Sequence, residues 1–288
     1  MPRAASWIRA CQHSGVADHS DGWTPRRIDL PSVPNLREVG GARAAGARRV
    51  RGNMLFRSTQ LSDVSDEDVQ ALSALNLSAV VDLRTEVEVI RAPDVRVTAS
   101  YVWLDVLRDF EPASSLGIEE VFTDPLRFEG ILRDGTAAGL MRQAYLAMVD
   151  LPSARESYAR WLVGLAEGSG PVLVHCTNGK DRTGWAVALV LLAVGVDLED
   201  VMTDYLTTNQ QLLPALDGMF RSVGQRMDPE LLLPVLGVQE DYLLAALEQV
   251  RRAGGLDTYL EGLGVTDAQR ADLSDRLTEP ADRVVAAD

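Results

Sequence analysis

Lysine is almost absent from the 288-residue sequence. Of its 28 basic residues one is a lysine, Lys180, and the remaining 27 are arginines. Since lysine is ordinarily among the commonest residues, the chain has a general bias toward arginine. The bias explains the scarcity of lysine but not the position of the single one, inside the seven-residue stretch from Cys176 to Arg182. A compact ammonium with three donors is not interchangeable with a planar guanidinium, so Lys180 is a candidate for contacting an anionic group.

Cysteine and long hydrophobic runs are also scarce. The two cysteines, Cys11 and Cys176, do not suggest a disulfide framework, and Cys11 lies in a polar segment where an incidental thiol is expected. No sustained apolar run follows Arg3, so no signal peptide is predicted. The longest apolar run, Trp185 to Val194, is too short to span a bilayer. We therefore expect a cytoplasmic protein without stable membrane association, although export without a signal peptide stays open.

Positive charge is in deficit. The net charge of −14 argues against general affinity for nucleic acid or for an anionic membrane. An anionic substrate would need a local positive pocket, built against the overall field of the protein. The chain is 46% hydrophobic and 24% charged, as expected of a globular protein, and it is long enough for one large domain or two small ones.

One stretch carries most of the chemical information, Pro171 to Gly184. The valine-rich run Val172 to Val174 predicts a short buried strand, Cys176 lies just after it, and a long apolar helix begins at Trp185. A strand, a glycine-containing loop and a helix N-terminus form an anion cradle from backbone N–H groups and the positive end of the helix dipole. This field stabilises the cysteine as a reactive thiolate, and Arg182 can fork onto the same oxyanion. The spacing is the Cys-x5-Arg arrangement of cysteine-dependent phosphatases.

Each residue of such a loop has an expected role. Cys176 is the candidate nucleophile, which would form a phosphocysteine intermediate. Thr183 is placed to hydrogen-bond the thiolate when it is released as a leaving group. His175 precedes the nucleophile, so its side chain should point to the other face of the strand and organise the loop rather than act as a base. The predicted phosphate-binding groups are Arg182 and the loop residues before it: Thr177, Asn178, Gly179, Lys180 and Asp181.

The donor of a proton to the leaving oxygen stays open among four aspartates. Asp181 ranks first because it lies inside the loop, the alternative being a carboxylate merely solvated at the pocket rim. Asp82 ranks second because it ends a predicted strand that should neighbour the catalytic strand, so that its carboxylate would face the pocket. Asp105 and Asp109 rank third, since related phosphatases often place a mobile acid loop after the next strand.

The elements before the loop alternate between strand and helix. Ser65 and the acidic residues behind it predict a helix start, Ala79 to Leu83 a buried strand, and Ser100 to Val106 another strand. Such alternation predicts an α/β fold with a central, mostly parallel sheet flanked by helices. The expected organisation is a loosely ordered extension over 1–27, a phosphatase domain over 28–278 and a frayed tail over 279–288.

Other segments are predicted to be helical. A helix is expected from Leu140 to Val149, and Ser153 with Glu156 forms a capping box predicted to start a second one. The apolar segment 210–237 should form two short helices, separated near Asp228-Pro229.

Five blocks of the sequence also carry a resemblance. In chain order they are Asn35-Leu36-Arg37-Glu38-Val39-Gly40-Gly41, Leu55-Phe56-Arg57-Ser58, Val80-Val81-Asp82-Leu83-Arg84-Thr85, His175-Cys176-x-x-Gly179-Lys180-x-Arg182-Thr183-Gly184 and Asp204-Tyr205-Leu206. Together they resemble the bacterial tyrosine phosphatase family of the phosphatase B type, related to dual-specificity phosphatases. The resemblance covers residues 28 to 275, approximately.

This resemblance implies the α/β fold of dual-specificity-like phosphatases, without metal or cofactor, and activity on phosphotyrosine, often with phosphoserine, phosphothreonine and phosphoinositides. Arg57 would support the loop. Lys180 resembles the loop lysine of phosphoinositide 3-phosphatases and Asp181 the loop aspartate of myotubularins, which fits broad specificity. Segment 210–237 matches the place of a helical lid in some members, with ordinary core helices as the alternative. Thr177-Asn178 replaces the small or aromatic pair often found there, a departure that bears on substrate preference.

Two hypotheses stay open beside a protein-tyrosine or dual-specificity phosphatase. One is a phosphoinositide phosphatase, whose substrate would be a lipid rather than a phosphorylated protein. The other is a catalytically silent phosphate-binding module, against which the presence of nucleophile, arginine and candidate acid argues. Nucleic acid is not an expected partner in any of these cases, and the oligomeric state is not predicted.

Overall fold

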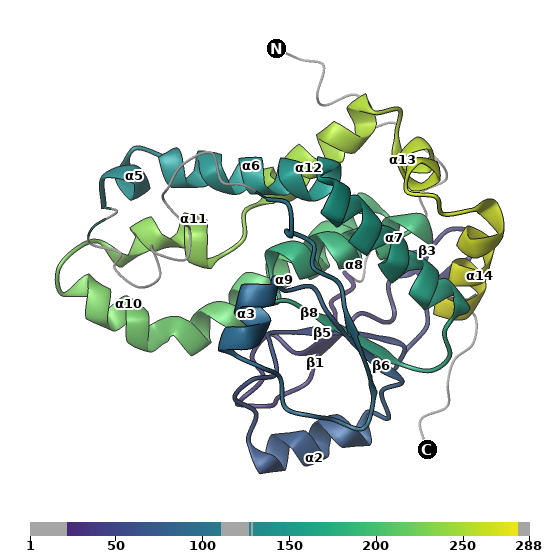
Figure 1. The fold of residues 1–288 in the computed structure, drawn as a ribbon, viewed down its shortest axis with the longest axis horizontal. Helices are drawn as coiled ribbons and strands as arrows, with labels where there is room; N and C mark the ends of the chain where they lie inside the picture. Colours follow the sequence, from purple (N-terminus) through teal and green to yellow (C-terminus); the bar gives the residue numbers. More distant parts are fainter. Residues whose placement is uncertain (1–21, 111–126, 128, 282–288) are drawn as a thin grey trace.

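The computed structural model describes residues 22–110, 127 and 129–281, and its centre is a six-stranded sheet (Figure 1). The spatial order is β1-β2-β5-β8-β6-β7. The four strands from β5 to β7 are parallel, and β2 and β1 add to them antiparallel, so the predicted mostly parallel sheet is confirmed. The strands are β1 (Arg26–Arg27), β2 (Arg37–Glu38), β5 (Leu55–Ser58), β8 (Val172–His175), β6 (Ala79–Asp82) and β7 (Ser100–Trp103).

Strand β8 places the Cys-x5-Arg stretch at the middle of the sheet. All four of its residues are buried, as the valine-rich run predicts for a central parallel strand. Its register aligns His175 with Ser58 of β5 on one side and with Asp82 of β6 on the other. The carboxyl ends of three parallel strands therefore meet where Cys176 begins the loop, the edge at which open α/β sheets bind ligands.

Helices cover the sheet on both faces. Figure 1 shows α2 below the sheet and the layer containing α7, α8 and α9 above it. Helix α8, which follows the loop, is buried along most of its length, and its apolar residues belong to the main hydrophobic core. The helices of this body are α2 (Asp66–Ala74), α3 (Glu86–Arg91), α6 (Thr136–Asp150), α7 (Pro152–Glu167), α8 (Asp181–Ala193), α9 (Leu198–Leu212), α12 (Glu240–Arg252), α13 (Leu256–Gly262) and α14 (Asp267–Leu277).

Short helices form a second, smaller hydrophobic cluster beside the main core. Figure 1 shows α5, α10 and α11 projecting to one side of the sheet. The chain breaks at Asp228, before Pro229, as predicted. Instead of two helices, however, 210–237 contains the end of α9 and four short pieces, because prolines recur in it. The short elements are α5 (Glu129–Arg133), η2 (Leu213–Leu216), α10 (Asp217–Gly224), η3 (Pro229–Leu232) and α11 (Leu233–Leu236).

The structure differs from the local expectations in three places. Ser153 does not cap a helix: α7 begins at Pro152, and the Ser153 hydroxyl donates to Val106 O at 2.9 Å and to Asp109. The expected extension contributes β1 to the main sheet. The expected tail begins with a strand, because β9 (Thr278–Pro280) pairs with β4 (Arg48–Val50), which also pairs with β3 (Arg43–Ala44). Isolated two- or three-residue strands leave no periodicity to recognise.

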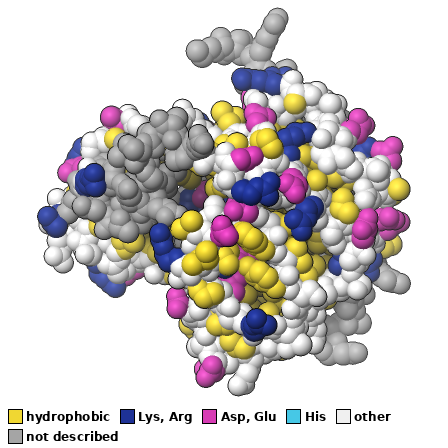
Figure 2. Space-filling model, in the orientation of Figure 1, with side chains coloured by type: hydrophobic (Ala, Val, Ile, Leu, Met, Phe, Trp, Pro, Cys, Tyr) yellow, Lys and Arg dark blue, Asp and Glu magenta, His cyan; other side chains and the backbone are white. Residues whose placement is uncertain are grey.

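Hydrophobic side chains gather on part of the surface. Four large exposed ones belong to α3 and the edge strand β7: Val87, Ile90, Tyr101 and Trp103. Figure 2 shows apolar side chains grouped in the lower half of this view, among interspersed acidic and basic ones. Within the described residues, no helix is both long and apolar enough to cross a bilayer.

Candidate active site

The loop between β8 and α8 can form only around a glycine. Gly179 has φ +61°, and a Cβ atom on it would lie 2.0 Å from the carbonyl oxygen of Ser58. No side chain fits into that space, and a non-glycine residue would also carry a left-handed backbone angle. Cys176, at the start of the loop, is only 2% exposed. The nucleophile candidate thus lies at the bottom of a tightly wound turn.

Two side chains hold the carbonyl groups of the loop from outside. Gly179 O accepts from Asn35 Nδ2 at 2.9 Å and from Arg57 Nη2 at 2.7 Å. Asn178 O and Lys180 O receive longer contacts of 3.3 and 3.4 Å from the same two residues. The N–H of a trans peptide points opposite to its C=O. Carbonyls held outward therefore leave the N–H groups of residues 179–181 directed to the other side, where an anion can meet them.

A buried ion-pair network fixes the residues that hold the loop. Asp204 accepts from Arg37 Nε at 2.8 Å and also from Arg57 Nη1, and Arg37 donates to the Thr208 hydroxyl at 3.0 Å. Burial and the charge of Arg57 lower the pKa of Arg37 to about 10, although the negative charge of Asp204 acts to raise it. Burial opposes ionisation of Asp204 too, but the two guanidinium groups lower its pKa below the usual range. Three of the sequence blocks thus meet beneath the loop, and Arg57 takes the supporting place expected of it.

Arg182 is held by a carboxylate that sequence reasoning missed. Its two terminal nitrogens each lie 2.6 Å from an oxygen of Glu88, on α3, and the Thr177 hydroxyl donates to the same carboxylate. Burial disfavours the charge on Glu88, yet Arg182 lowers its pKa well below the usual range. Glu88 also completes a capping box with Thr85. That Thr-x-x-Glu pattern, readable in the sequence, marks the helix start but not the contact with Arg182.

Lys180 and Asp181 form a close pair at the N-terminus of α8. Lys180 Nζ lies 2.6 Å from Asp181 Oδ2 and 3.4 Å from Gly237 O, and the lysine is buried. Asp181 Oδ1 accepts a hydrogen bond of 2.9 Å from the Tyr145 hydroxyl. The lone lysine of the chain is therefore in the loop wall, with an acidic partner beside it.

Asp82 lies in a different group of residues from Asp181. It is register partner of His175, so their side chains share a face of the sheet, whereas Cys176 follows on the opposite face. Its carboxylate is fully buried and accepts from Arg84 and from Tyr101, each at 2.7 Å. Burial opposes its charge, but the hydrogen bond from Arg84 leads the interactions that lower its pKa. Asp82 neighbours the catalytic strand as predicted but faces His175.

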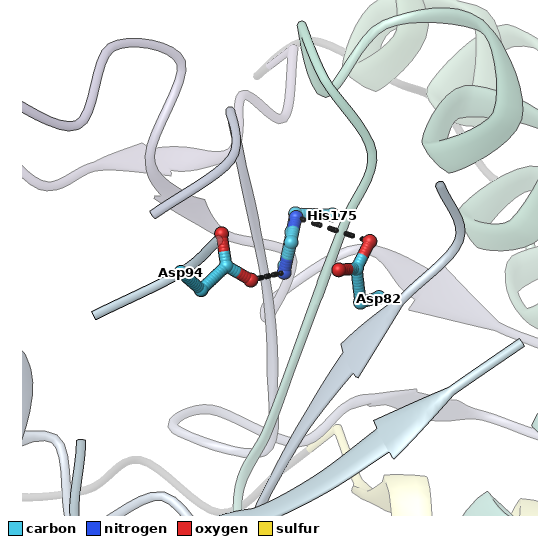
Figure 3. A group of neighbouring side chains, drawn as sticks. All are labelled: Asp82, Asp94 and His175. Atoms are coloured by element: carbon cyan, nitrogen blue, oxygen red, sulfur yellow. Dashed lines mark ion pairs between the residues drawn. The ribbon is translucent and has the colours of Figure 1, made fainter. Parts of the chain in front are cut away.

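His175 lies between the carboxylates of Asp94 and Asp82 (Figure 3). Its Nε2 lies 3.0 Å from Asp94 Oδ2, and its Nδ1 lies 3.9 Å from Asp82 Oδ1 and 3.2 Å from Cys176 O. Two carboxylates and an imidazole could hold a metal ion. Here, however, the Arg84 guanidinium contacts Asp82 at 2.7 Å and Asp94 at 2.9 Å, so positive charge is already supplied.

The remaining candidates are placed individually. Asp105 is half-buried and accepts from the backbone of Glu86 and Leu107; burial raises its pKa, against the attraction of Arg182. Asp109 binds Ser153, whose hydroxyl lowers its pKa. The Thr183 hydroxyl is buried without a hydrogen-bond partner among the described residues.

Known proteins are similar to this chain along most of its length. The model of the tyrosine phosphatase family matches residues 28–279, most of the chain. The chain belongs to the tyrosine phosphatase family. The family resemblance stated from the sequence blocks is thereby confirmed.

Two curated relatives of the phosphatase are 32% identical to it. One is the Cupriavidus necator protein H16_A0669, whose name places it among tyrosine-protein phosphatases; the match covers 84% of this chain and 86% of the relative. The other is the Mycobacterium tuberculosis triple specificity protein phosphatase PtpB, with 83% and 95% covered. Among solved structures, TpbA of P. aeruginosa aligns with 86% of this chain and 99% of its own at 19% identity, with a TM-score of 0.31.

Proposed function

We propose that this protein hydrolyses phosphotyrosine and other phosphomonoesters through a phosphocysteine intermediate. The observation that carries the proposal is the loop geometry. Cys176 lies at its base, the N–H groups of residues 179–181 point away from the held carbonyls, and Arg182 is oriented by Glu88. A nucleophile, a set of fixed donors and a planar cation at one helix N-terminus are what phosphoryl transfer by a cysteine needs.

In the first step, the Cys176 thiolate attacks phosphorus. The S–P bond forms as the P–O bond to the leaving group breaks, and the leaving oxygen takes the bond's electron pair together with a proton from an acid. The phenol or alcohol then departs. Arg182 and the backbone N–H groups bind the equatorial oxygens, whose charge they stabilise throughout the transfer.

In the second step, water attacks the phosphorus of the phosphocysteine. The acid of the first step, now a carboxylate, accepts a proton from the water; an O–P bond forms and the S–P bond breaks. Inorganic phosphate is released, and the electron pair returns to sulfur as thiolate. The Thr183 hydroxyl, buried and otherwise unpartnered, would donate a hydrogen bond to that thiolate.

Asp181 is the acid that the geometry favours. It is on the loop itself, one residue before Arg182, and its side chain is 23% exposed, so solvent and substrate can reach it. The placement of Asp82, buried against Arg84 on the His175 side, argues against that candidate, and Asp109 is engaged by Ser153. Asp105 is the second candidate. Burial raises its pKa, and its carboxylate interacts electrostatically with Arg182.

Two substrate classes follow from the chemistry of the loop. The curated relative named a triple specificity phosphatase supports broad acceptance of phosphomonoesters in this chain as well. Lys180 supports a second function, phosphoinositide hydrolysis, since an added cation in the wall of the loop favours a substrate with additional phosphate groups. Phosphate release from a panel of inositol lipids, compared with phosphopeptides, decides between them. A cytoplasmic location remains part of the proposal.

The projecting helices support a lid over the site. These helices have their own hydrophobic cluster, which is separate from the main core. The last of them, α11, ends just before Gly237, whose carbonyl oxygen accepts a hydrogen bond from Lys180 Nζ. A segment with a separate core can move with respect to the sheet at modest cost. We therefore propose one phosphatase domain over 28–278, to whose edges β1 and the end of β9 add, and within which 210–237 closes on bound substrate.

Replacing the nucleophile tests the mechanism. Cys176→Ser should abolish hydrolysis of p-nitrophenyl phosphate while phosphate still binds and the melting temperature stays close to that of the wild type. Substantial turnover by this variant would refute cysteine catalysis. Tight phosphate binding by the wild-type protein, with no turnover of any phosphoester, would instead support the silent binding module.

A further inference from the structure

The two oxygens of Asp181 have different partners. Oδ2 lies 2.6 Å from Lys180 Nζ, while Oδ1 accepts a hydrogen bond of 2.9 Å from the hydroxyl of Tyr145. Tyr145 is fully buried and belongs to α6, 36 residues before Asp181. A helix outside all the sequence blocks therefore supplies a donor to the favoured proton-transfer group.

The direction of this hydrogen bond follows from the second partner of the Tyr145 hydroxyl. Tyr145 OH also lies 2.6 Å from Tyr205 OH. Burial, with the negative charge of Asp181 as a further cause, raises the pKa of both tyrosines well above the usual value, so each keeps its proton. An ionised carboxylate only accepts. Tyr145 therefore donates to Asp181 and accepts from Tyr205, which gives a directed chain of three groups.

Aromatic packing fixes the position of the Tyr145 hydroxyl. Its ring meets that of Tyr205 edge-on, with centroids 6.3 Å apart, and lies tilted at 5.7 Å from that of Tyr242. Tyr242 directs its own hydroxyl to Pro234 O, at 2.9 Å, rather than to the loop. A phenylalanine would provide the same packing. The buried hydroxyl of Tyr145 needs partners in addition, and it finds them in Asp181 and Tyr205.

We propose that Tyr145 is a positioning residue for proton transfer by Asp181, a role that rests on the phosphatase function proposed above. When Asp181 has given its proton to the leaving oxygen, the carboxylate that remains receives the Tyr145 O–H hydrogen bond. No proton leaves Tyr145 in this step. The same contact fixes the orientation of the carboxylate while it accepts a proton from the attacking water. Tyr205 keeps the Tyr145 hydroxyl turned toward Asp181.

The test compares two tyrosines of one cluster. Tyr145→Phe removes the hydroxyl that contacts Asp181, and Tyr242→Phe removes one that contacts a backbone carbonyl. We measure kcat on phenyl phosphate, whose leaving oxygen needs a proton, and on p-nitrophenyl phosphate, whose more acidic phenol needs less help. Tyr145→Phe should lower kcat for phenyl phosphate about tenfold, as expected for a lost hydrogen bond to a charged group, and for p-nitrophenyl phosphate less than about threefold.

The pH profile provides the second readout. In Tyr145→Phe the basic limb of kcat should move to higher pH, because the carboxylate form loses a stabilising donor. Tyr242→Phe should show neither the substrate-dependent loss nor the shift. Equal losses on both substrates, or identical behaviour of the two variants, would overturn the proposal. If Tyr145→Phe does not fold, as thermal unfolding will show, Tyr205→Phe takes its place and must show the same substrate dependence. A wild-type enzyme inactive on both substrates would refute the proposed function itself.

Discussion

Glu88 binds both terminal nitrogens of Arg182 at 2.6 Å, across a sequence separation of 94 residues. The pair is largely buried, and the planar guanidinium is thereby fixed by one carboxylate before any phosphate is present on its other side. A bidentate contact of this kind sets the plane as well as the position of the group.

Weakening this contact should impair phosphate binding and turnover together. Glu88→Gln keeps the size of the side chain but removes its charge, so Arg182 loses its fixed plane. We expect kcat/KM for p-nitrophenyl phosphate to fall about tenfold or more, the scale of one charge-assisted hydrogen bond. Glu86→Gln, an exposed neighbour on the same helix, is the matched control and should stay within about twofold. Equal kinetics of the two variants would contradict the role of Glu88.

The loop glycine should tolerate no side chain. Gly179→Ala would place a Cβ atom 2.0 Å from Ser58 O, on backbone with φ +61°, so either the loop or β5 must move. We expect loss of activity and a free energy of unfolding reduced by about 2 kcal/mol or more. Gly139→Ala, within α6, meets nothing within 4 Å and should stabilise the protein by roughly 0.5–1 kcal/mol. Urea unfolding of both variants checks the contrast, and a neutral Gly179→Ala would show that the loop is not constrained.

Acid should weaken the network beneath the loop. Arg37 and Arg57 lower the pKa of Asp204 in the folded protein, so its ionisation stabilises the fold above the unfolded pKa, near 3.8. That contribution is lost as the pH falls through the lower folded pKa. In Asp204→Asn two buried guanidinium groups lose their counter-charge, and we expect the free energy of unfolding at neutral pH to fall by about 3–5 kcal/mol.

The matched control for this prediction is Asp275→Asn. Asp275 is exposed and lies 3.6 Å from Arg48, so its loss should change the stability by less than about 1 kcal/mol. Denaturant unfolding between pH 2 and pH 7 measures both variants. An Asp204→Asn variant as stable as Asp275→Asn at neutral pH would mean that the buried network contributes little.

Short sequence patterns were sufficient to predict the central strand of the sheet and the loop that follows it. The valine-rich run predicts β8, and the spacing of Cys176, Gly179 and Arg182 predicts the loop between strand and helix. Asp82 shows the limit: its strand was predicted beside β8, but the face it occupies depends on pairing register, which a single strand does not encode.

Apart from Arg57, the contacts that support the loop could not be predicted from sequence patterns. Arg37 and Asp204 form a hydrogen bond although they are 167 residues apart in the sequence, and the sequence around Glu88 predicts only a helix cap. Tyr145, on a helix identified by its apolar residues, is indistinguishable there from a core aromatic residue. Such contacts follow from how the elements pack, and periodicity within one element carries no information about its partners.

The residues that hold the loop also affect the order in which contacts form during folding. Asn35 reaches Gly179 across 144 residues, and Asp204, behind Arg57, comes later in the chain than the loop. Contacts of such separation form late, after long segments of chain have been brought together. A fragment that contains Cys176 to Arg182 without residues 35–57 would keep the motif but not the phosphate cradle. The cradle around Cys176 should therefore assemble only after these distant segments have packed together.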